Sequence, residues 1–123
     1  MKESVVARIG IWMSAMLSPI LPMIWAMQFL IFTDFVTGIY AAWKNKEPIQ
    51  SAKMGRTITK FLFYTLLLIS GFVFETYFVP EVPFARVAGG YIAMTEIRSI
   101  YENANKIFGI NIWEQVKHMI NKK

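Results

Sequence analysis

The fold is decided by residues 9–43, IGIWMSAMLSPILPMIWAMQFLIFTDFVTGIYAAW, in which Asp34 is the one charged residue. A transmembrane helix needs about 20 mostly apolar residues, so this stretch is long enough for one span and short for two. Pro19 and Pro22 interrupt it, because proline removes a backbone donor and clashes with the preceding helical turn. We therefore expect an interfacial helix over residues 3–18 and a span over residues 20–43. The alternative packs two short spans into residues 9–43.

The rest of the chain holds two further apolar runs and a short amphipathic segment. Residues 61–79 contain a single charge, Glu75, and residues 82–95 a single charge, Arg86. These runs predict spans over residues 61–79 and 84–103, the second continuing as a helix up to Gly109. Residues 111–121 place apolar side chains three or four positions apart, which predicts an amphipathic helix on the membrane surface. The predicted fold class is all-α: a small integral membrane protein, one membrane domain over residues 1–123, with three transmembrane helices or, in the alternative, four.

The composition agrees with a membrane protein and disfavours a soluble enzyme. Of the 123 residues, 55% are hydrophobic and 17% are charged, whereas a soluble domain carries about 25% charged residues. The chain has no cysteine, which excludes disulfides and cysteine-ligated metal sites. It also lacks a Ser/His/Asp set, a glycine-rich phosphate loop and paired histidines. We therefore expect no catalytic residues, no cofactor and no metal.

The basic residues are concentrated in one segment, residues 44–60. Five bases stand there against one acid, Glu47, for a net charge of +4; the bases are Lys44, Lys46, Lys53, Arg56 and Lys60. Cytoplasmic loops of membrane proteins carry the excess of Lys and Arg, so these five residues are the predicted topology determinants. This places the basic segment and the C-terminus in the cytoplasm, and residues 75–86 outside. The anionic inner leaflet is the expected partner of the basic segment, and no nucleic-acid motif accompanies it.

Asp34 is the first candidate functional residue, because it lies inside an apolar stretch. A charged group at the centre of a span costs at least about 2.5 kcal/mol, so Asp34 should face protein or water, or be protonated. Gly38 follows four residues later on the same helical face, with Thr37 nearby. Two interpretations stay open: a position that lines or gates an oligomer, or a buried hydrogen bond to a neighbouring helix.

The second candidate is the polar part of the last predicted span, where a helix would carry polar residues on two sides. With 3.6 residues per turn, one stripe contains Glu96, Ser99 and Asn103. Another stripe contains Arg98 and Glu102, whose i,i+4 spacing allows an ion pair. We expect one stripe to meet protein and the other to meet water. The alternative is a solvated helix that emerges from the membrane.

The order of these motifs is similar to that of a known family. The pieces are Asp34-Phe35-Val36-Thr37-Gly38, then Lys44 to Lys46, Ser51, Gly55, Arg56 and Lys60, then Glu96-Ile97-Arg98-Ser99-Ile100-Tyr101-Glu102-Asn103, then Gly109-Ile110. Over about residues 30–120 they resemble the phage holins grouped with clostridial toxin-secretion proteins. One departure is Asn111-Ile112-Trp113, where that family often has a proline, which affects the angle expected for the last helix.

The resemblance implies a protein that self-associates in the bacterial cytoplasmic membrane and opens lesions. A separate cell-wall hydrolase (an endolysin) or a toxin would escape through them. The pore or oligomer contacts are then expected at Asp34, Thr37, Gly38, Glu96, Ser99 and Asn103. The alternative, from a different class, is a small membrane scaffold or anchor that recruits a partner through its basic segment and C-terminal helix.

Overall fold

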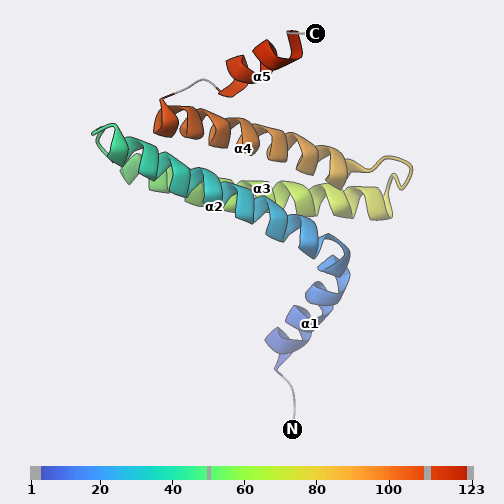
Figure 1. The fold of residues 1–123 in the computed structure, drawn as a ribbon. Helices are drawn as coiled ribbons and strands as arrows, with labels where there is room; N and C mark the ends of the chain where they lie inside the picture. The colour runs from blue at the N-terminus through green and yellow to red at the C-terminus, as the bar shows by residue number, and fades with distance from the viewer. Residues whose placement is uncertain (1–3, 50, 110–111, 122–123) are drawn as a thin grey trace.

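The computed structural model describes residues 4–49, 51–109 and 112–121, and this part of the chain is helical apart from its turns. The elements are α1 (Val5–Leu17), the 3₁₀ helix η1 (Ser18–Ile20), α2 (Leu21–Lys44), α3 (Ser51–Tyr77), α4 (Phe84–Phe108) and α5 (Ile112–Asn121). The all-α prediction is confirmed. Figure 1 shows α2, α3 and α4 side by side as a bundle, with α1 diverging from it at one end and α5 lying beyond α4.

The two prolines redirect the chain between α1 and α2. Pro19 lies in the first turn of η1 and Pro22 in the first turn of α2, positions where the missing backbone donor leaves no hydrogen bond unmade. The chain therefore passes through a single 3₁₀ turn and leaves in a new direction, so α1 points away from the bundle (Figure 1). None of the residues of α1 is buried.

The C-terminal ends of α2 and α4 lie at the same end of the bundle (Figure 1). These two helices run in the same direction, and α3 runs in the opposite one. The Lys44 ammonium donates to the carbonyl of Ile107, and Asn45 Nδ2 donates to the carbonyl of Lys106 at 3.3 Å. A cation at the last carbonyls of a helix satisfies unpaired acceptors and favours its dipole. The α2–α3 turn and the end of α4 therefore lie together.

The other end fixes the start of α4 against the end of α3. Glu75 Oε1 accepts a hydrogen bond from the backbone N–H of Ala85 at 3.2 Å, which satisfies one of the free donors at the start of α4. A Cβ added to Gly71 would lie 3.3 Å from the same nitrogen, so the glycine allows the two helices to approach closely. At its far end α4 stops at Gly109, whose φ of +66° is the left-handed conformation of a helix cap.

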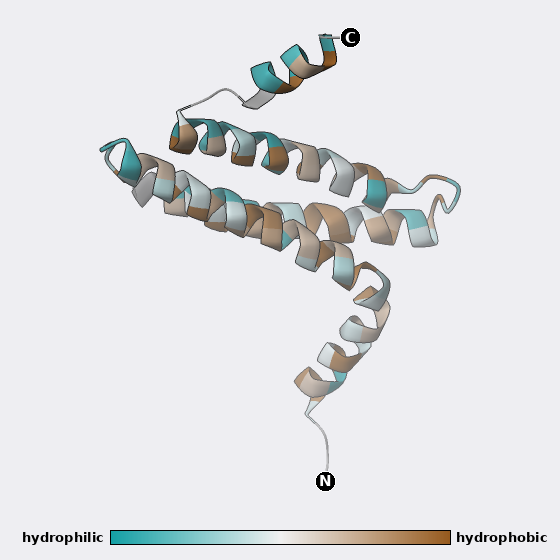
Figure 2. Ribbon diagram, viewed as in Figure 1, coloured by the Kyte–Doolittle hydropathy of each residue, from teal (hydrophilic) through white to brown (hydrophobic). Residues whose placement is uncertain are grey.

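The bundle is apolar outside as well as inside. Its core is formed by Ile20, Ile24, Met27, Ile31, Leu68 and Ile92. Large hydrophobic side chains also cover the outer surface, among them Trp25, Phe29, Phe32, Leu62, Phe63, Leu66, Tyr91 and Met94. Figure 2 shows hydrophobic residues spread along α2 and α3, with hydrophilic residues gathered at the α2–α3 turn. A soluble protein rarely exposes so continuous an apolar surface, whereas a lipid-facing one requires it.

Two helical stretches are long and apolar enough to cross a membrane, Val5–Lys44 and Lys53–Tyr77. The first includes α1, η1 and α2, and the second is most of α3. α4 is not one of them, so the span over residues 84–103 stays a prediction. Every side chain that the structure describes in α5 is exposed, including Val116, Met119 and Ile120 of its predicted apolar face. The Ile112 and Trp113 side chains of that face lie outside the described residues.

Candidate functional site

The inward faces of α2 and α4 change from apolar to polar along their length. On α2 the buried residues are Ile24, Met27, Ile31, Asp34, Gly38, Ala41 and Ala42. On α4 they are Ala85, Ile92, Glu96 and Asn103. Apart from the adjacent Ala41 and Ala42, they recur every three, four or seven residues and so form one stripe on each helix. The polar halves of the two stripes face each other near the end of the bundle that carries the α2–α3 turn, and α3 closes the third side.

Asp34 lies at the centre of the resulting buried polar cluster, which we define as Asp34, Thr37, Lys60, Glu96, Ser99 and Asn103. Ser99 Oγ donates to Asp34 Oδ1 at 2.6 Å, and Asn103 Nδ2 donates to the same oxygen at 2.9 Å. Asn103 Nδ2 also lies 3.1 Å from the backbone carbonyl of Asp34 and 3.0 Å from Thr37 Oγ1. Hydrogen bonds from α4 thus hold it to α2 at an aspartate that is only 9% exposed.

Lys60 of α3 completes the cluster. Its ammonium lies 3.3 Å from Asp34 Oδ2 and 3.1 Å from Glu96 Oε1, so two carboxyl groups from different helices share one cation. Glu96 is fully buried, and neither of its carboxyl oxygens accepts a well-aligned hydrogen bond within the described residues. The lysine side chain is about one-third exposed (33%) and so reaches the cluster from the edge of the bundle. Removing one partner of a buried ion pair is costly, because the other charge is left uncompensated.

Gly38 makes room beside the cluster for a second lysine of α3. A Cβ on Gly38 would lie 2.6 Å from Lys53 Nζ and 2.9 Å from Lys53 Cε, closer than real side chains allow. It would also lie 3.5 Å from Asn103 Nδ2. The absence of a side chain at this position therefore lets the Lys53 stem cross the face of α2.

The structure brings together the six candidates named from the sequence. Asp34, Thr37, Glu96, Ser99 and Asn103 contact one another directly or through Lys60, and Gly38 borders them. Within one chain Asp34 makes buried hydrogen bonds to a neighbouring helix, which was the second of the two interpretations of this residue.

Lys60 is the member of the cluster that sequence reasoning missed, since it was assigned to the basic segment as a topology determinant. Its position directly before the apolar run 61–79 was the available signal. Of the other predicted determinants, Lys44 binds the end of α4, Lys53 lies over Gly38, and Lys46 and Arg56 are exposed.

The second polar stripe of α4 lies apart from the cluster. Arg98 Nε is 3.7 Å from Glu102 Oε1, and both side chains are mostly exposed, at 84% and 63%. An exposed pair of this kind contributes little to stability. Within the described residues no group of three or more histidine, aspartate or glutamate side chains is arranged to hold a metal ion.

The apolar outer surface, the polar interior and the two long apolar helices together define a small helical membrane protein. A model of the bacteriophage holin family matches residues 11–122, so the chain belongs to this family. The family is one of pore-forming membrane proteins rather than enzymes. The resemblance to phage holins is thereby confirmed. No curated protein and no solved structure matches the chain.

Proposed function

We propose that the protein oligomerises in the bacterial cytoplasmic membrane and forms lesions that release a cell-wall hydrolase or a toxin. The observation that carries this proposal is the buried polar cluster, enclosed by three helices that expose many large hydrophobic side chains. Almost all of the described residues belong to these helices or to the short α1 and α5. We therefore assign the function to the membrane part and to self-association.

The cluster supplies a physical basis for a closed and an open state. In lipid every polar group must find a partner inside the protein, and the closed chain satisfies this by pairing the stripes of α2 and α4. An open lesion needs the opposite arrangement, with polar stripes facing water and apolar faces toward lipid. Separating α4 from α2 exposes Asp34, Glu96, Ser99 and Asn103 at once. Several copies that open together would line a water-filled lesion with these residues.

We propose that α4 is the third span, although its average hydropathy is low. Its 25 residues reach about 37 Å at 1.5 Å per residue, enough to cross a bilayer. Glu96, Ser99 and Asn103 lie on the face that α2 and α3 cover, so the lipid does not meet them, whereas Arg98 and Glu102 are exposed on another face. With α2, α3 and α4 as spans, the α2–α3 turn and the C-terminus share one side, and the basic segment makes that side the cytoplasm. α1 and α5 then lie in the two interfaces.

The alternative function is a membrane scaffold, and the exposure of α5 is the observation that favours it. An amphipathic helix whose described side chains are all exposed is available to a partner as well as to lipid. Induced expression in a bacterium, with membrane potential recorded over time, separates the two functions. A lesion former depolarises the cells abruptly after a delay. A scaffold leaves the potential intact, and a flat trace at verified membrane insertion would reject our proposal.

A further inference from the structure

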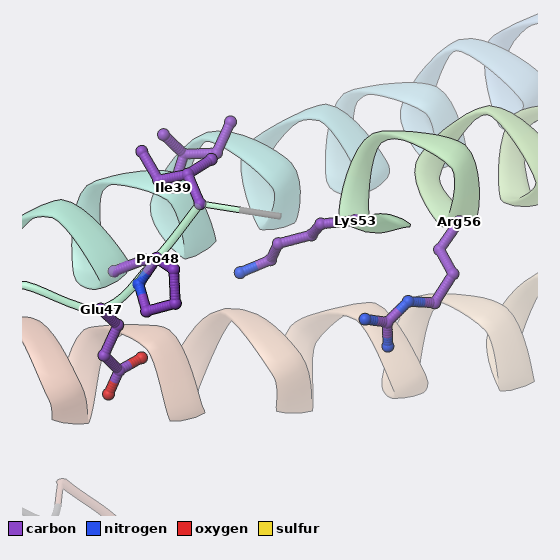
Figure 3. A pocket seen from close by; sticks show the side chains of 7 residues that line it. Ile39, Glu47, Pro48, Lys53 and Arg56 are labelled. Carbon is purple, nitrogen blue, oxygen red and sulfur yellow. The ribbon is translucent and has the colours of Figure 1, made fainter. Parts of the chain in front are cut away.

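A hollow of about 420 Å³ lies where the α2–α3 turn meets the first turns of α3, beside the polar cluster but separate from it. This volume falls in the range of about 300–1,000 Å³ that is typical of small-molecule sites. Its charged lining residues are Glu47, Lys53 and Arg56, and its apolar ones include Ile39, Pro48 and Ile49. Figure 3 shows the Lys53 ammonium pointing from α3 toward the turn, with Arg56 one turn further along the same helix.

In the part of the chain that the structure describes, the two cations of this hollow have no anionic partner. Neither Lys53 nor Arg56 makes an ion pair or a side-chain hydrogen bond within the described residues, and Glu47 makes no ion pair there either. Lys53 is half-buried over Gly38, where removal from water makes an uncompensated charge costly. Lys60, on the same stripe of α3, is neutralised by Asp34 and Glu96. The lining thus keeps a net charge of +1.

We propose that this hollow binds the phosphate of an anionic phospholipid head group in the leaflet that the α2–α3 turn faces. One monoanionic head group neutralises the net charge of the lining, whereas a zwitterionic one leaves it unchanged. The planar guanidinium of Arg56 suits two phosphate oxygens at once, and Lys53 supplies a second, compact charge. Ile39 and Ile49 offer apolar surface to the glycerol backbone and the first methylenes.

The position of the hollow favours a lipid over a free anion. It opens at the end of α2, where the exposed aromatic Trp43 is followed by Lys44, the sequence of side chains found at a membrane–water interface. A lipid phosphate lies at this depth and is already concentrated there, because the basic segment attracts an anionic leaflet. This binding site does not depend on lesion formation, so it can be present in a scaffold as well.

The test titrates the purified full chain in neutral detergent micelles and counts bound lipids by native mass spectrometry. The probes are phosphatidylglycerol, phosphatidylethanolamine, phosphatidylcholine and inorganic phosphate. The site variant is Lys53→Gln with Arg56→Gln. Its matched control is Lys46→Gln with Lys106→Gln, which removes two exposed charges outside the hollow.

We expect the site variant to lose about thirtyfold in affinity for phosphatidylglycerol, since each of the two lining cations would make a direct charge-assisted contact with the phosphate. The control should lose less than about threefold, because its exposed charges are screened by salt. Arg56→Gln alone should lose about fivefold in affinity for phosphatidylglycerol. Because Arg56 is exposed, this single variant still tests the site if the double variant misfolds.

Three results would overturn the proposal. Equal losses in the site variant and the control would mean diffuse attraction rather than a site. Equal affinity for phosphatidylethanolamine or phosphatidylcholine would remove the anionic head group as the ligand. Inorganic phosphate binding as tightly as phosphatidylglycerol would identify a site for free phosphate instead of a lipid.

Discussion

The ammonium of Lys60 is the single cation between two carboxyl groups, and Lys60→Met removes it while keeping an apolar stem of similar length. Breaking a buried ion pair costs about 3–5 kcal/mol, because the remaining charge is left uncompensated. Lys60 contacts Asp34 at 3.3 Å and Glu96 at 3.1 Å, but its side chain is 33% exposed, so solvent screening lowers the cost. We expect Lys60→Met to destabilise the folded bundle by about 2–3 kcal/mol.

The assay is unfolding of the purified protein by sodium dodecyl sulfate in mixed micelles, followed by circular dichroism. The matched control is Arg98→Met, which removes an exposed cation from a surface pair and should cost no more than about 0.5 kcal/mol. Adding Glu96→Gln to Lys60→Met removes the fully buried carboxylate that has lost its partner, so the double variant should recover about 1–2 kcal/mol. This recovery distinguishes electrostatic coupling from lost packing, which a second substitution would only worsen.

Two outcomes of these unfolding measurements would contradict a stabilising role for the Lys60 ammonium. If Lys60→Met and Arg98→Met unfold at the same detergent fraction, the shared ammonium does not stabilise the bundle. If Glu96→Gln adds its own destabilisation to that of Lys60→Met, the two side chains are not coupled and the cluster is not a unit.

Three further predictions address timing, packing and topology. Asp34→Asn should shift the moment of depolarisation in induced cells, because it removes a charge from the closed cluster; unchanged timing at equal expression would argue against a gating role. Gly38→Leu should destabilise the bundle by about 1–3 kcal/mol in the detergent assay, because Gly38 is buried and a Cβ there would already lie 3.5 Å from Asn103 Nδ2, so a leucine side chain would displace this asparagine as well as the flexible end of Lys53. Gly90→Leu, with open space around it, should change stability little, and a reversed order would contradict the packing. With the basic segment inside, a cysteine at Glu81 should react with an impermeant thiol reagent added to intact cells and one at Asn45 should not; the opposite pattern would invert the topology.

The helices follow from local patterns, which is why the sequence predicted them well. Pro19 and Pro22 act through missing donors and steric clash, and Gly109 acts through its tolerance of a positive φ; neither effect needs the rest of the fold. The stripe of Glu96, Ser99 and Asn103 was also visible, because it depends only on helical periodicity. The all-α architecture and the candidate stripes could therefore be predicted from the sequence.

Which residues these stripes contact is determined by how the helices pack in the bundle. Asp34 and Asn103 are 69 residues apart, and nothing local determines that one accepts from the other within a single chain. The contacts of Lys60 could not be predicted from local sequence either. By sequence it belongs to the basic segment, yet a long flexible stem lets its ammonium reach the interior.

The average hydropathy of α4 is low because the helix carries two polar stripes. One stripe is covered by α2, whereas Arg98 and Glu102 of the other are mostly exposed. A window average treats a buried polar side chain and an exposed one alike.

The proposed opening of lesions for a protein cargo is tested most directly by co-expression with a cell-wall hydrolase that lacks an export signal. Turbidity of the culture is recorded after induction of each gene alone and of both together, with membrane insertion of the chain verified. We expect an abrupt collapse of turbidity after a delay only when both are expressed, because the hydrolase reaches the wall through the lesions. Cultures that stay turbid with both proteins present and the chain inserted would contradict it.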